Sequence, residues 1–341
     1  MAGLWIVWLW SAGGLAAGHN SPALVRFEFT QVEMAVPFKL VLYAPDAAAA
    51  TSAARAAFAR VHALNAIMSD YDPESELNRL CRTSGEGKAV PVSDDLWKVL
   101  AHAEALSARC EGAFDVTVGP VVRLWRRARR RGELPPPEDL NAARALVGYR
   151  LVRLDPQRHA VELLKPGMRL DLGGIAKGYA TEEALRALNK AGISRALVDA
   201  GGDLRLGDPP PDAAGWKVGL TPLDNIRRPT SYLVLANVAV STSGDAIQFV
   251  EIGGRWYSHI VDPRTGMGLT DRSRVTVVAP DGMVADGLTK AVVVLGPEKG
   301  LKLIDETPYA AAFLTRVPEG KIQSYPSKRW KSLAEERVTG E

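Results

Sequence analysis

The sequence predicts an α+β fold with mixed or largely antiparallel sheets and flanking helices. Most candidate strands follow one another through short turns, as in hairpins, which favours antiparallel pairing. Helical patterns lie between the strands at irregular intervals, whereas a parallel sheet requires a regular alternation of strands and helices. The chain has 341 residues, of which 47% are hydrophobic and 24% charged, an ordinary globular composition that can form a sizeable core.

Residues 1–18 are apolar and end in small residues, a pattern typical of a secretory signal peptide. The apolar run carries no Lys or Arg before it, and it is too short and Gly-rich for a membrane span. We therefore expect an exported protein, periplasmic or at a membrane surface. The alternatives are a misassigned start codon and a loose cytoplasmic N-terminus.

The first part of the chain alternates strand and helix patterns with clear end signals. Residues 27–43 predict two strands joined around Met34, and an alanine-rich helix follows over Ala47–Met68. That helix must end before Pro73, because proline disfavours helical geometry for the residue before it. Residues 75–80 begin like a capped helical turn, and Ser93 is a suitable N-cap for an amphipathic helix with an apolar stripe.

Another helix pattern follows residues 112–120 and ends, in our prediction, at three consecutive prolines, Pro135, Pro136 and Pro137. It carries a run of basic residues: Arg123, Arg126, Arg127, Arg129, Arg130 and Arg131. Such a run is typical of a solvated helix face, and the alternative is a docking surface for an acidic partner. The net charge of +3 gives no global case for nucleic-acid binding.

The second part of the chain predicts mostly strands. A hairpin is expected over 149–164, and 195–208 reads as two strands around a Gly pair. The proline-rich loop at 207–215 is the best candidate boundary between two subdomains. Further strands are expected at 216–220, 231–241, 255–261, 274–279 and 309–315, helical segments at 283–295 and 297–305, and a loose charged tail at 328–341.

The stretch 169–180, RLDLGGIAKGYA, is the strongest local candidate for a site. A strand-like run through Leu170 and Leu172 breaks at Gly173-Gly174, and a helix pattern begins near Lys177. Glycine permits close backbone approach, and the unsatisfied N–H groups and dipole at a helix start favour an anion such as phosphate. A tight turn is the alternative, and the spacing matches neither the dinucleotide fingerprint nor the P-loop.

The two cysteines, Cys81 and Cys110, have no CxxC partner, so a metal–thiolate site is not expected. A single disulfide would be compatible with export. Cys110 lies in a helix pattern, which favours a buried thiol.

Several Asp residues stand next to Gly, Ser or Thr, an arrangement that in any single case is typical of turns and caps. Taken together and in order, these blocks resemble the ApbE family, the FAD:protein FMN transferases. The resemblance runs from about residue 34 to about residue 305. It rests on SDYDPESELNRL (69–80), GAFDVTVGPVVRLW (112–125), DLGGIAKGYA (171–180), ALVDAGGDL (196–204), STSGD (241–245), SHIVDPRTG (258–266) and APDGMVADGLTKAVVVLGPEKGL (279–301).

The resemblance implies an exported, Mg²⁺-dependent enzyme that cleaves FAD at its pyrophosphate. FMN moves to a Thr or Ser of an acceptor protein with a [ST]-Gly-Ala-[ST]-type motif, and AMP leaves. It also implies an ApbE-like domain over residues 19–327 with two subdomains and FAD in the cleft between them. A membrane-associated acceptor is compatible with export. Alternatives are an FAD pyrophosphatase that forms FMN and AMP, and a flavin-binding protein without turnover.

The resemblance also assigns roles to individual residues. His259 would assist the attacking hydroxyl, because a neutral imidazole can accept its proton. Asp286 would be catalytic by holding Mg²⁺ with the Gly174 carbonyl, because hard cations prefer oxygen ligands. Tyr71 and Phe114 suit ring stacking, with core packing as the alternative. FAD contacts are expected at Met34, Tyr71, Ala113, Phe114, Asp115, Asp171, Lys177 and Val261.

Two positions depart from the family pattern. The family usually has Thr four residues after the metal-binding Asp, where this chain has Lys290; Thr289 lies one residue earlier. Three interpretations stay open: Lys290 points away and Thr289 or water completes the metal shell, Lys290 replaces part of the cation's role, or metal-dependent transfer is weakened in favour of binding or hydrolysis. The second departure is Ala35-Val36-Pro37 after Met34, where relatives often have Gly-Thr.

Overall fold

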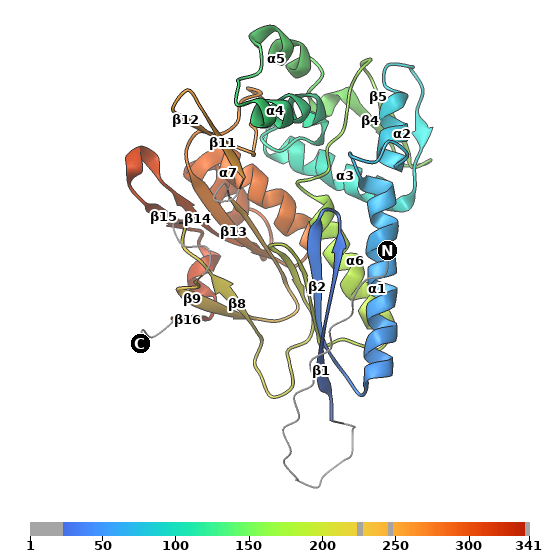
Figure 1. The fold of residues 1–341 in the computed structure, drawn as a ribbon, viewed down its shortest axis with the longest axis vertical. Coiled ribbons are helices and arrows are strands. Elements are labelled where there is room, and N and C mark those ends of the chain that lie inside the picture. Colours follow the sequence, from blue (N-terminus) through green and yellow to red (C-terminus); the bar gives the residue numbers. More distant parts are fainter. Residues whose placement is uncertain (1–22, 224–227, 245–247, 338–341) are drawn as a thin grey trace.

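The computed structural model describes residues 23–223, 228–244 and 248–337. One eight-stranded sheet organises the molecule, and all of its neighbouring strands pair antiparallel (Figure 1). The predicted α+β fold with largely antiparallel sheets is confirmed. In spatial order the strands are β1 (Val25–Glu33), β2 (Val36–Ala44), β6 (Ala196–Ala200), β7 (Asp203–Leu206), β10 (Ala239–Gly244), β13 (Ser273–Ala279), β14 (Ala311–Arg316) and β15 (Gln323–Pro326).

Strand formation follows the alternation of apolar residues. Phe27 and Phe29 on β1, and Phe38, Leu40 and Leu42 on β2, are buried on one face, as the two-residue period of a strand requires. Phe29 pairs with Leu40 across the hairpin, so the two strands add their side chains to the same core.

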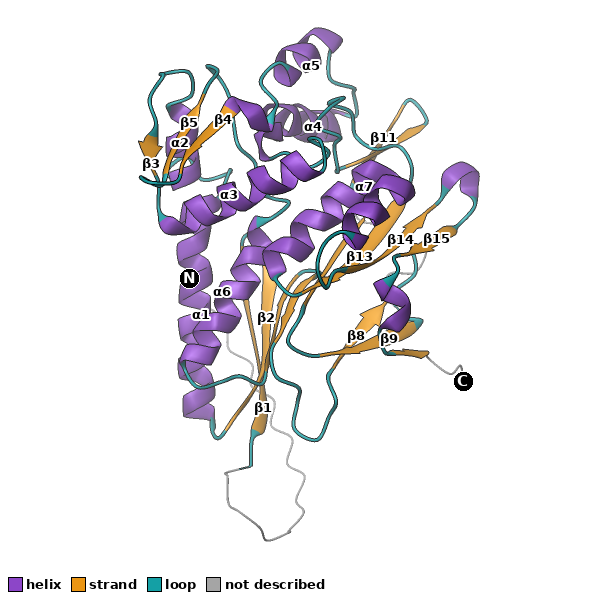
Figure 2. Cartoon of the chain, turned by 180° about the vertical axis from the view of Figure 1, so that it is seen from behind, coloured by secondary structure: helices purple, strands orange, loops and turns teal. Residues whose placement is uncertain are grey.

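Three helices cover that face of the sheet: α1 (Ala47–Met68), α6 (Ala176–Lys190) and α7 (Gly282–Asp305) (Figure 2). Asp46 caps α1 by accepting a hydrogen bond from the backbone N–H of Ala49 at 2.8 Å. Helix α7 contains both predicted helical segments, which meet at a break where Gly296 takes a φ of 77° just before Pro297.

A smaller sheet packs on the opposite face. Its strands are β8 (Trp216–Leu220), β9 (Ser231–Leu235) and β16 (Glu335–Arg337), in the order β16-β9-β8. Trp330, only 5% exposed, joins this second core with Trp216 and Leu233. The prediction of a loose tail is therefore wrong over 328–337, because burial of the Trp330 ring and pairing of β16 with β9 hold this segment; 338–341 lie outside the described residues.

The remaining elements lie around one end of the large sheet (Figure 1). They comprise the helices α2 (Glu76–Arg82), α3 (Asp94–Arg109), α4 (Gly119–Arg131) and α5 (Pro137–Arg144); the sheet of β3 (Val90–Pro91), β5 (Ala160–Leu163) and β4 (Val152–Asp155); and the hairpin of β11 (Phe249–Ile252) and β12 (Arg255–Ser258). A third hydrophobic cluster around Trp125 connects α4 and α5 to Tyr257 of this hairpin.

Two local predictions are wrong. Residues 168–172 form no strand: Met168, Leu170 and Leu172 are buried, but the Asp171 N–H bonds the Val116 carbonyl instead of a sheet neighbour. The three prolines do not end α4, which stops at Gly132 with a φ of 70°, a left-handed C-terminal cap. Pro137 instead begins α5, since proline is well tolerated in the first turn of a helix.

The predicted signal peptide, residues 1–18, lies outside the described residues. Among the helices that the structure describes, none combines the length and apolar character that a membrane crossing needs. Both cysteines are buried free thiols, as favoured for Cys110.

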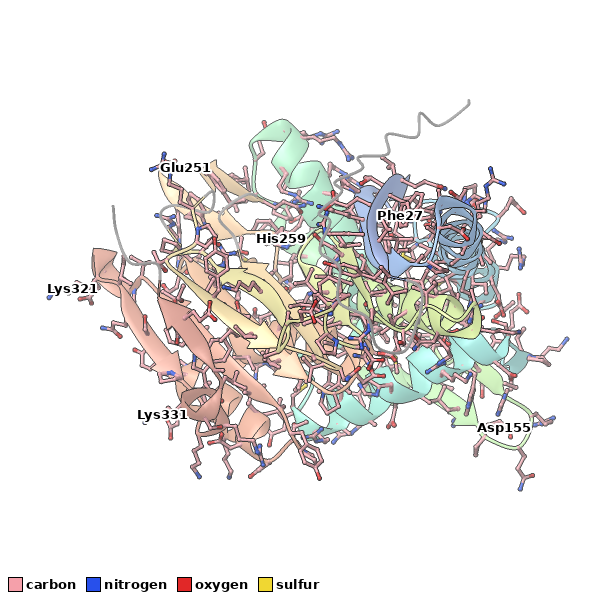
Figure 3. All side chains as sticks on the ribbon, turned by 90° about the horizontal axis from the view of Figure 1, so that it is seen from below. Phe27, Asp155, Glu251, His259, Lys321 and Lys331 are labelled. Atoms are coloured by element: carbon pink, nitrogen blue, oxygen red, sulfur yellow. The ribbon has the colours of Figure 1, made fainter. Side chains whose placement is uncertain are left out.

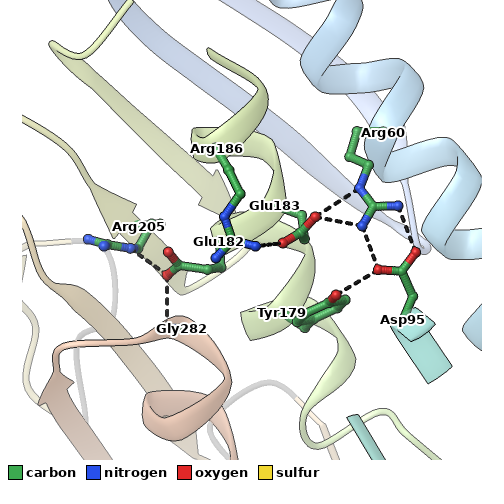
Figure 4. Close-up of polar contacts among 8 residues, drawn as sticks. All are labelled: Arg60, Asp95, Tyr179, Glu182, Glu183, Arg186, Arg205 and Gly282. Carbon is green, nitrogen blue, oxygen red and sulfur yellow. Dashed lines mark hydrogen bonds and ion pairs between the residues drawn. The ribbon is translucent and has the colours of Figure 1, made fainter. Parts of the chain in front are cut away.

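A polar network fixes the position of α6 (Figure 4). Arg60 of α1 donates to Asp95 of α3 at 2.8 and 2.5 Å, and to Glu183 of α6 at 3.0 and 2.5 Å; the Tyr179 hydroxyl donates to Asp95 at 2.6 Å. On the other side of α6, Arg205 of β7 pairs with Glu182 at 2.6 Å. Helix α6 is thus connected by charge to two helices and to the large sheet.

We expect Arg60→Met to lower the free energy of unfolding by about 2 kcal/mol, because it leaves the largely buried carboxylate of Asp95 without its cation and Glu183 with Arg186 alone. Urea denaturation measures the change. Arg55→Met, on an exposed position of the same helix, is the control and should change stability by less than about 0.5 kcal/mol. Equal effects of the two substitutions would contradict this role for Arg60.

Candidate active site

The site is built where α6 crosses α7. Gly178 and Gly282 face each other so closely that a Cβ on Gly178 would lie 2.1 Å from the Gly282 carbonyl oxygen, and one on Gly282 would lie 2.3 Å from the Gly178 carbonyl oxygen. Only glycine allows this approach. As a result, the backbone N–H of Gly178 reaches the Asp286 carboxylate of α7 at 3.1 Å.

Four charged residues gather at this crossing, and we refer to Lys177, Asp203, Asp286 and Lys290 as the lysine–aspartate cluster. Lys177 in the first turn of α6 pairs with Asp203, the first residue of β7. Lys290 pairs with Asp286 one turn before it on α7. Ser241 of β10 donates its hydroxyl to the second oxygen of Asp203 at 2.5 Å.

The charges of the cluster stabilise one another in a buried setting. Burial opposes charge on Lys177, but Asp203 and Asp286 outweigh it and hold the pKa of Lys177 above its usual range. Burial likewise opposes charge on Asp286, whose side chain is fully buried, but Lys290 and Lys177 outweigh it and lower the pKa of Asp286. Lys177 and Asp286 are therefore both charged at neutral pH.

Gly174 lies directly against this cluster. A Cβ placed on Gly174 would lie 3.3 Å from Lys290 Cγ and 3.3 Å from Phe114 Cε2. The predicted neighbours Gly174, Lys177 and Asp286 are thus brought together. The Thr289 hydroxyl contacts other groups than the Asp286 carboxylate: it donates to the Asp286 backbone carbonyl at 2.7 Å and lies 2.9 Å from the Ser243 hydroxyl.

The expected Mg²⁺ set does not fit the described side chains. One oxygen of Asp286 holds the Lys290 ammonium and the other accepts from Gly178, while the Thr289 hydroxyl bonds within its own helix. In the described part of the chain, no group of three or more His, Cys, Asp or Glu side chains is gathered for a metal ion. In this structure Lys290 does not point away from Asp286, because its ammonium pairs with that carboxylate.

A second polar group surrounds Asp171. Its carboxylate accepts from the Gly173 N–H at 2.8 Å and from Arg126 of α4 at 3.0 Å. Arg126 also pairs with Asp70 and lies 4.4 Å above the ring of Tyr71. Burial, followed by the charge of Asp70, raises the pKa of Asp171.

The basic run of α4 therefore combines two environments. Arg123, Arg127, Arg130 and Arg131 are exposed, as expected of a solvated face. Arg126 instead turns inward to the two carboxylates. Tyr71 is 72% exposed, so its ring offers a surface for stacking.

Residues 113–115 have a structural role in the described chain. Ala113 and Phe114 are core residues, so Phe114 presents no open ring face for stacking. Asp115 caps the 3₁₀ turn at Val116–Val118 by accepting from the Thr117 N–H at 2.8 Å, the Thr117 hydroxyl at 2.6 Å and the Tyr149 N–H at 2.6 Å. Burial raises the pKa of Asp115.

The β1–β2 hairpin places Met34 at the margin of this region. Met34 and Ala35 form its two-residue turn with φ values of 47° and 62°, a left-handed conformation that usually selects Asn or Gly. The next residue, Val36, lies beside the Gly pair that joins β6 to β7, because a Cβ on Gly201 would be 3.4 Å from Val36 Cβ. That Gly pair leads directly into Asp203 of the cluster.

His259 follows the β11–β12 hairpin and lies toward the middle of the molecule, whereas Glu251 of β11 is at its edge (Figure 3). The Nδ1 atom of His259 lies 3.0 Å from the Gln248 carbonyl oxygen. Since a carbonyl only accepts, Nδ1 carries the proton and Nε2 is the basic nitrogen. Burial and the charges of Lys290, Arg129 and Lys177 lower the pKa of His259 to about 4.

The segment after His259 lines a pocket beside the hairpin. Val261 is buried in the Trp125 cluster and forms a bridge to Gly268. The pocket has a volume of about 320 Å³ and is lined by Arg255, Tyr257, Asp262, Thr265, Met267, Gly268, Leu269 and Thr270. The charges of Lys290 and Lys177 thus act on His259, while Val261 is buried in the apolar Trp125 cluster.

Comparison with known proteins assigns the arrangement to a family. The ApbE family model matches residues 30–314. The chain belongs to the ApbE family. It is 32% identical over 279 residues to a curated FAD:protein FMN transferase of Haemophilus influenzae, covering 80% of each chain, and 33% identical over 273 residues to one of Vibrio cholerae, covering 79% and 80%.

Solved ApbE structures share the fold. The chain is similar to the flavin transferase ApbE from Vibrio cholerae with a TM-score of 0.82 and 27% identity, covering 91% of this chain and all of that one. The apo form of the Pseudomonas stutzeri flavinyl transferase ApbE gives a TM-score of 0.81 and 29% identity, covering 92% and 98%. The predicted family and its fold are confirmed.

Three residues of the site were not among the sequence-based candidates: Asp203, Ser241 and Arg126. Asp203 and Ser241 stand in the clusters GGD and STSGD, so their Gly and Ser neighbours were a usable signal. No signal in the sequence singled out Arg126. It stands in a run with five other arginines, and its inward direction depends on Asp70 and Asp171 from distant segments.

We expect the His259 imidazole to stay neutral between pH 8 and pH 5. With a pKa of about 4, only about 3% is protonated at pH 5.5, whereas an ordinary histidine of pKa 6.5 would be about 90% protonated. NMR of imidazole-labelled protein measures this, with His259→Gln identifying the resonance. A titration midpoint near 6.5 for that resonance would contradict the half-buried environment with neighbouring cations.

Proposed function

We propose that this protein transfers FMN from FAD to a Thr or Ser hydroxyl of an acceptor protein and releases AMP. The observation that carries the proposal is that Lys177 and Lys290 lie at the start of α6 in an ApbE fold. The charges of both lysines also act on His259, whose imidazole is neutral. Curated relatives that share about a third of the sequence over four-fifths of the chain are FAD:protein FMN transferases.

The residues fit the chemistry of phosphoryl transfer. The acceptor oxygen forms a bond to the phosphorus of the FMN half, and the bond from that phosphorus to the bridging oxygen breaks. AMP leaves with the bridging oxygen and its electron pair. His259 Nε2 accepts the proton of the attacking hydroxyl, and Lys177 at the start of α6 neutralises phosphate charge.

Asp171, Arg126 and Tyr71 suit the recognition of a ring system. Tyr71 is exposed and backed by the Arg126 guanidinium, so its outer face can stack on a flavin or an adenine. We assign these residues to FAD binding. Met34 lies in the turn of the β1–β2 hairpin, and Ala113, Phe114 and Val261 are packed in apolar clusters, so we propose that they support FAD binding from within the fold.

The acceptor we propose carries a [ST]-Gly-Ala-[ST]-type motif and meets the protein outside the cytoplasm, at a periplasmic or membrane surface. This part rests on the apolar leader at 1–18 and on the family resemblance. The rival activity is hydrolysis, in which water replaces the acceptor hydroxyl and FMN and AMP are both released. The rival without turnover is simple flavin binding.

We expect the purified protein, given FAD and millimolar Mg²⁺, to release AMP only when an acceptor bearing the motif is present. AMP by chromatography and covalent flavin on the acceptor by mass spectrometry should appear in equal amounts. His259→Gln should slow transfer about 100-fold or more, since general-base assistance contributes on that order. AMP without acceptor would favour the hydrolase, and no AMP in either case would leave only a flavin-binding protein.

The matched control is His62→Gln. The His62 side chain is 74% exposed on α1, and its only charged neighbour among the described residues is Glu33 at 3.5 Å. Transfer by this variant should stay within twofold of the unmodified protein. An equal loss in both variants would contradict a specific role for His259.

A further inference from the structure

The pairing of Lys290 with Asp286 sets the charge of the site before any ligand binds. Asp286 is fully buried, and the Lys290 side chain is 19% exposed. A buried carboxylate without a partner is strongly destabilising, so the ammonium is the ion that compensates Asp286 in the free protein. Lys177, whose side chain is 24% exposed, compensates the almost fully buried carboxylate of Asp203 in the same way.

A divalent cation would have to compete with this lysine. One Asp286 oxygen already accepts from the Lys290 ammonium, and the other accepts from the Gly178 N–H. Two like charges on one carboxylate oxygen repel each other strongly in a buried setting. Metal binding at Asp286 would therefore require Lys290 to leave and its charge to be placed elsewhere.

The two lysines also point to where a diphosphate would lie. The Lys290 stem packs against Gly174, two residues before the start of α6, and Lys177 is in the first turn of that helix. An ammonium has three N–H donors, and the described ion pair of each lysine uses one. Donors from both lysines therefore remain for phosphate oxygens at a helix start that already favours anions.

We propose that Lys290 is the resident cation of this site, so that this protein grips the FAD diphosphate between Lys290 and Lys177 without a divalent metal. The proposal rests on the proposed function, because it takes FAD as the ligand. In the transfer step, Lys290 donates a hydrogen bond to the diphosphate and neutralises the charge that develops on the bridging oxygen as it leaves with AMP.

The first experiment measures FAD binding by flavin fluorescence in EDTA and in millimolar MgCl₂. The unmodified protein should bind FAD with dissociation constants within twofold of each other in the two buffers. Lys290→Gln, which removes the charge at similar length, should weaken binding in EDTA tenfold or more, because charge-assisted hydrogen bonds are the stronger class. Lys290→Arg, which keeps the charge, should retain metal-independent binding.

The second experiment makes the site accept a metal. Lys290→Thr removes the ammonium and offers a hydroxyl one turn from Asp286 on the same helix face. Its FAD binding should be weak in EDTA and recover in MgCl₂. Its melting temperature without FAD should rise with MgCl₂, whereas that of the unmodified protein should not. Lys299→Gln, at an exposed position of α7, is the control and should match the unmodified protein throughout.

The outcomes separate this proposal from the proposed function. A tenfold or greater loss of FAD binding by the unmodified protein in EDTA overturns the resident-cation role, even if flavin transfer proceeds in Mg²⁺. Unchanged binding by Lys290→Gln in EDTA also overturns it. Metal-independent FAD binding without any transfer to an acceptor supports Lys290 and contradicts the transferase activity instead.

Discussion

The site depends on the contact between Gly178 and Gly282. Because neither residue has a side chain, the backbones of α6 and α7 approach closely enough for the Gly178 N–H to reach Asp286. This contact brings the start of α6, with Gly174 and Lys177, beside the carboxylate and ammonium of α7. A methyl group at either glycine would separate the helices and with them the two ion pairs of the cluster.

The surrounding fold keeps this crossing in place. Helices α6 and α7 lie on one face of the large sheet, and β7 and β10 below them supply Asp203 and Ser241. The Arg60 network holds α6 from the side of α1 and α3, and Arg205 holds it from the sheet (Figure 4). Buried charges tolerate little displacement, so a rigid support is the physical condition for keeping the buried carboxylates of Asp203 and Asp286 paired with their lysines.

His259 reaches the site by a different route. It follows a two-stranded hairpin that is separate from the large sheet and packs through Tyr257 on α4. One hydrogen bond from Nδ1 to the Gln248 carbonyl decides which nitrogen is basic, and burial together with the neighbouring cations keeps that nitrogen unprotonated. The same positive field that would attract a diphosphate therefore also prepares the histidine as a proton acceptor.

Much of the fold follows from the sequence alone. Apolar alternation determined β1 and β2, Ser93 determined where α3 begins, and the ordered Asp–Gly blocks pointed to the ApbE family. These are local signals. They fail where the outcome depends on distant partners: residues 168–172 have strand periodicity but no strand beside them, and the tail is held by Trp330 in a core formed by remote segments. The roles of Arg126 and Lys290 were likewise decided only in three dimensions, because the direction of a long charged side chain is set by the carboxylates that folding places within its reach.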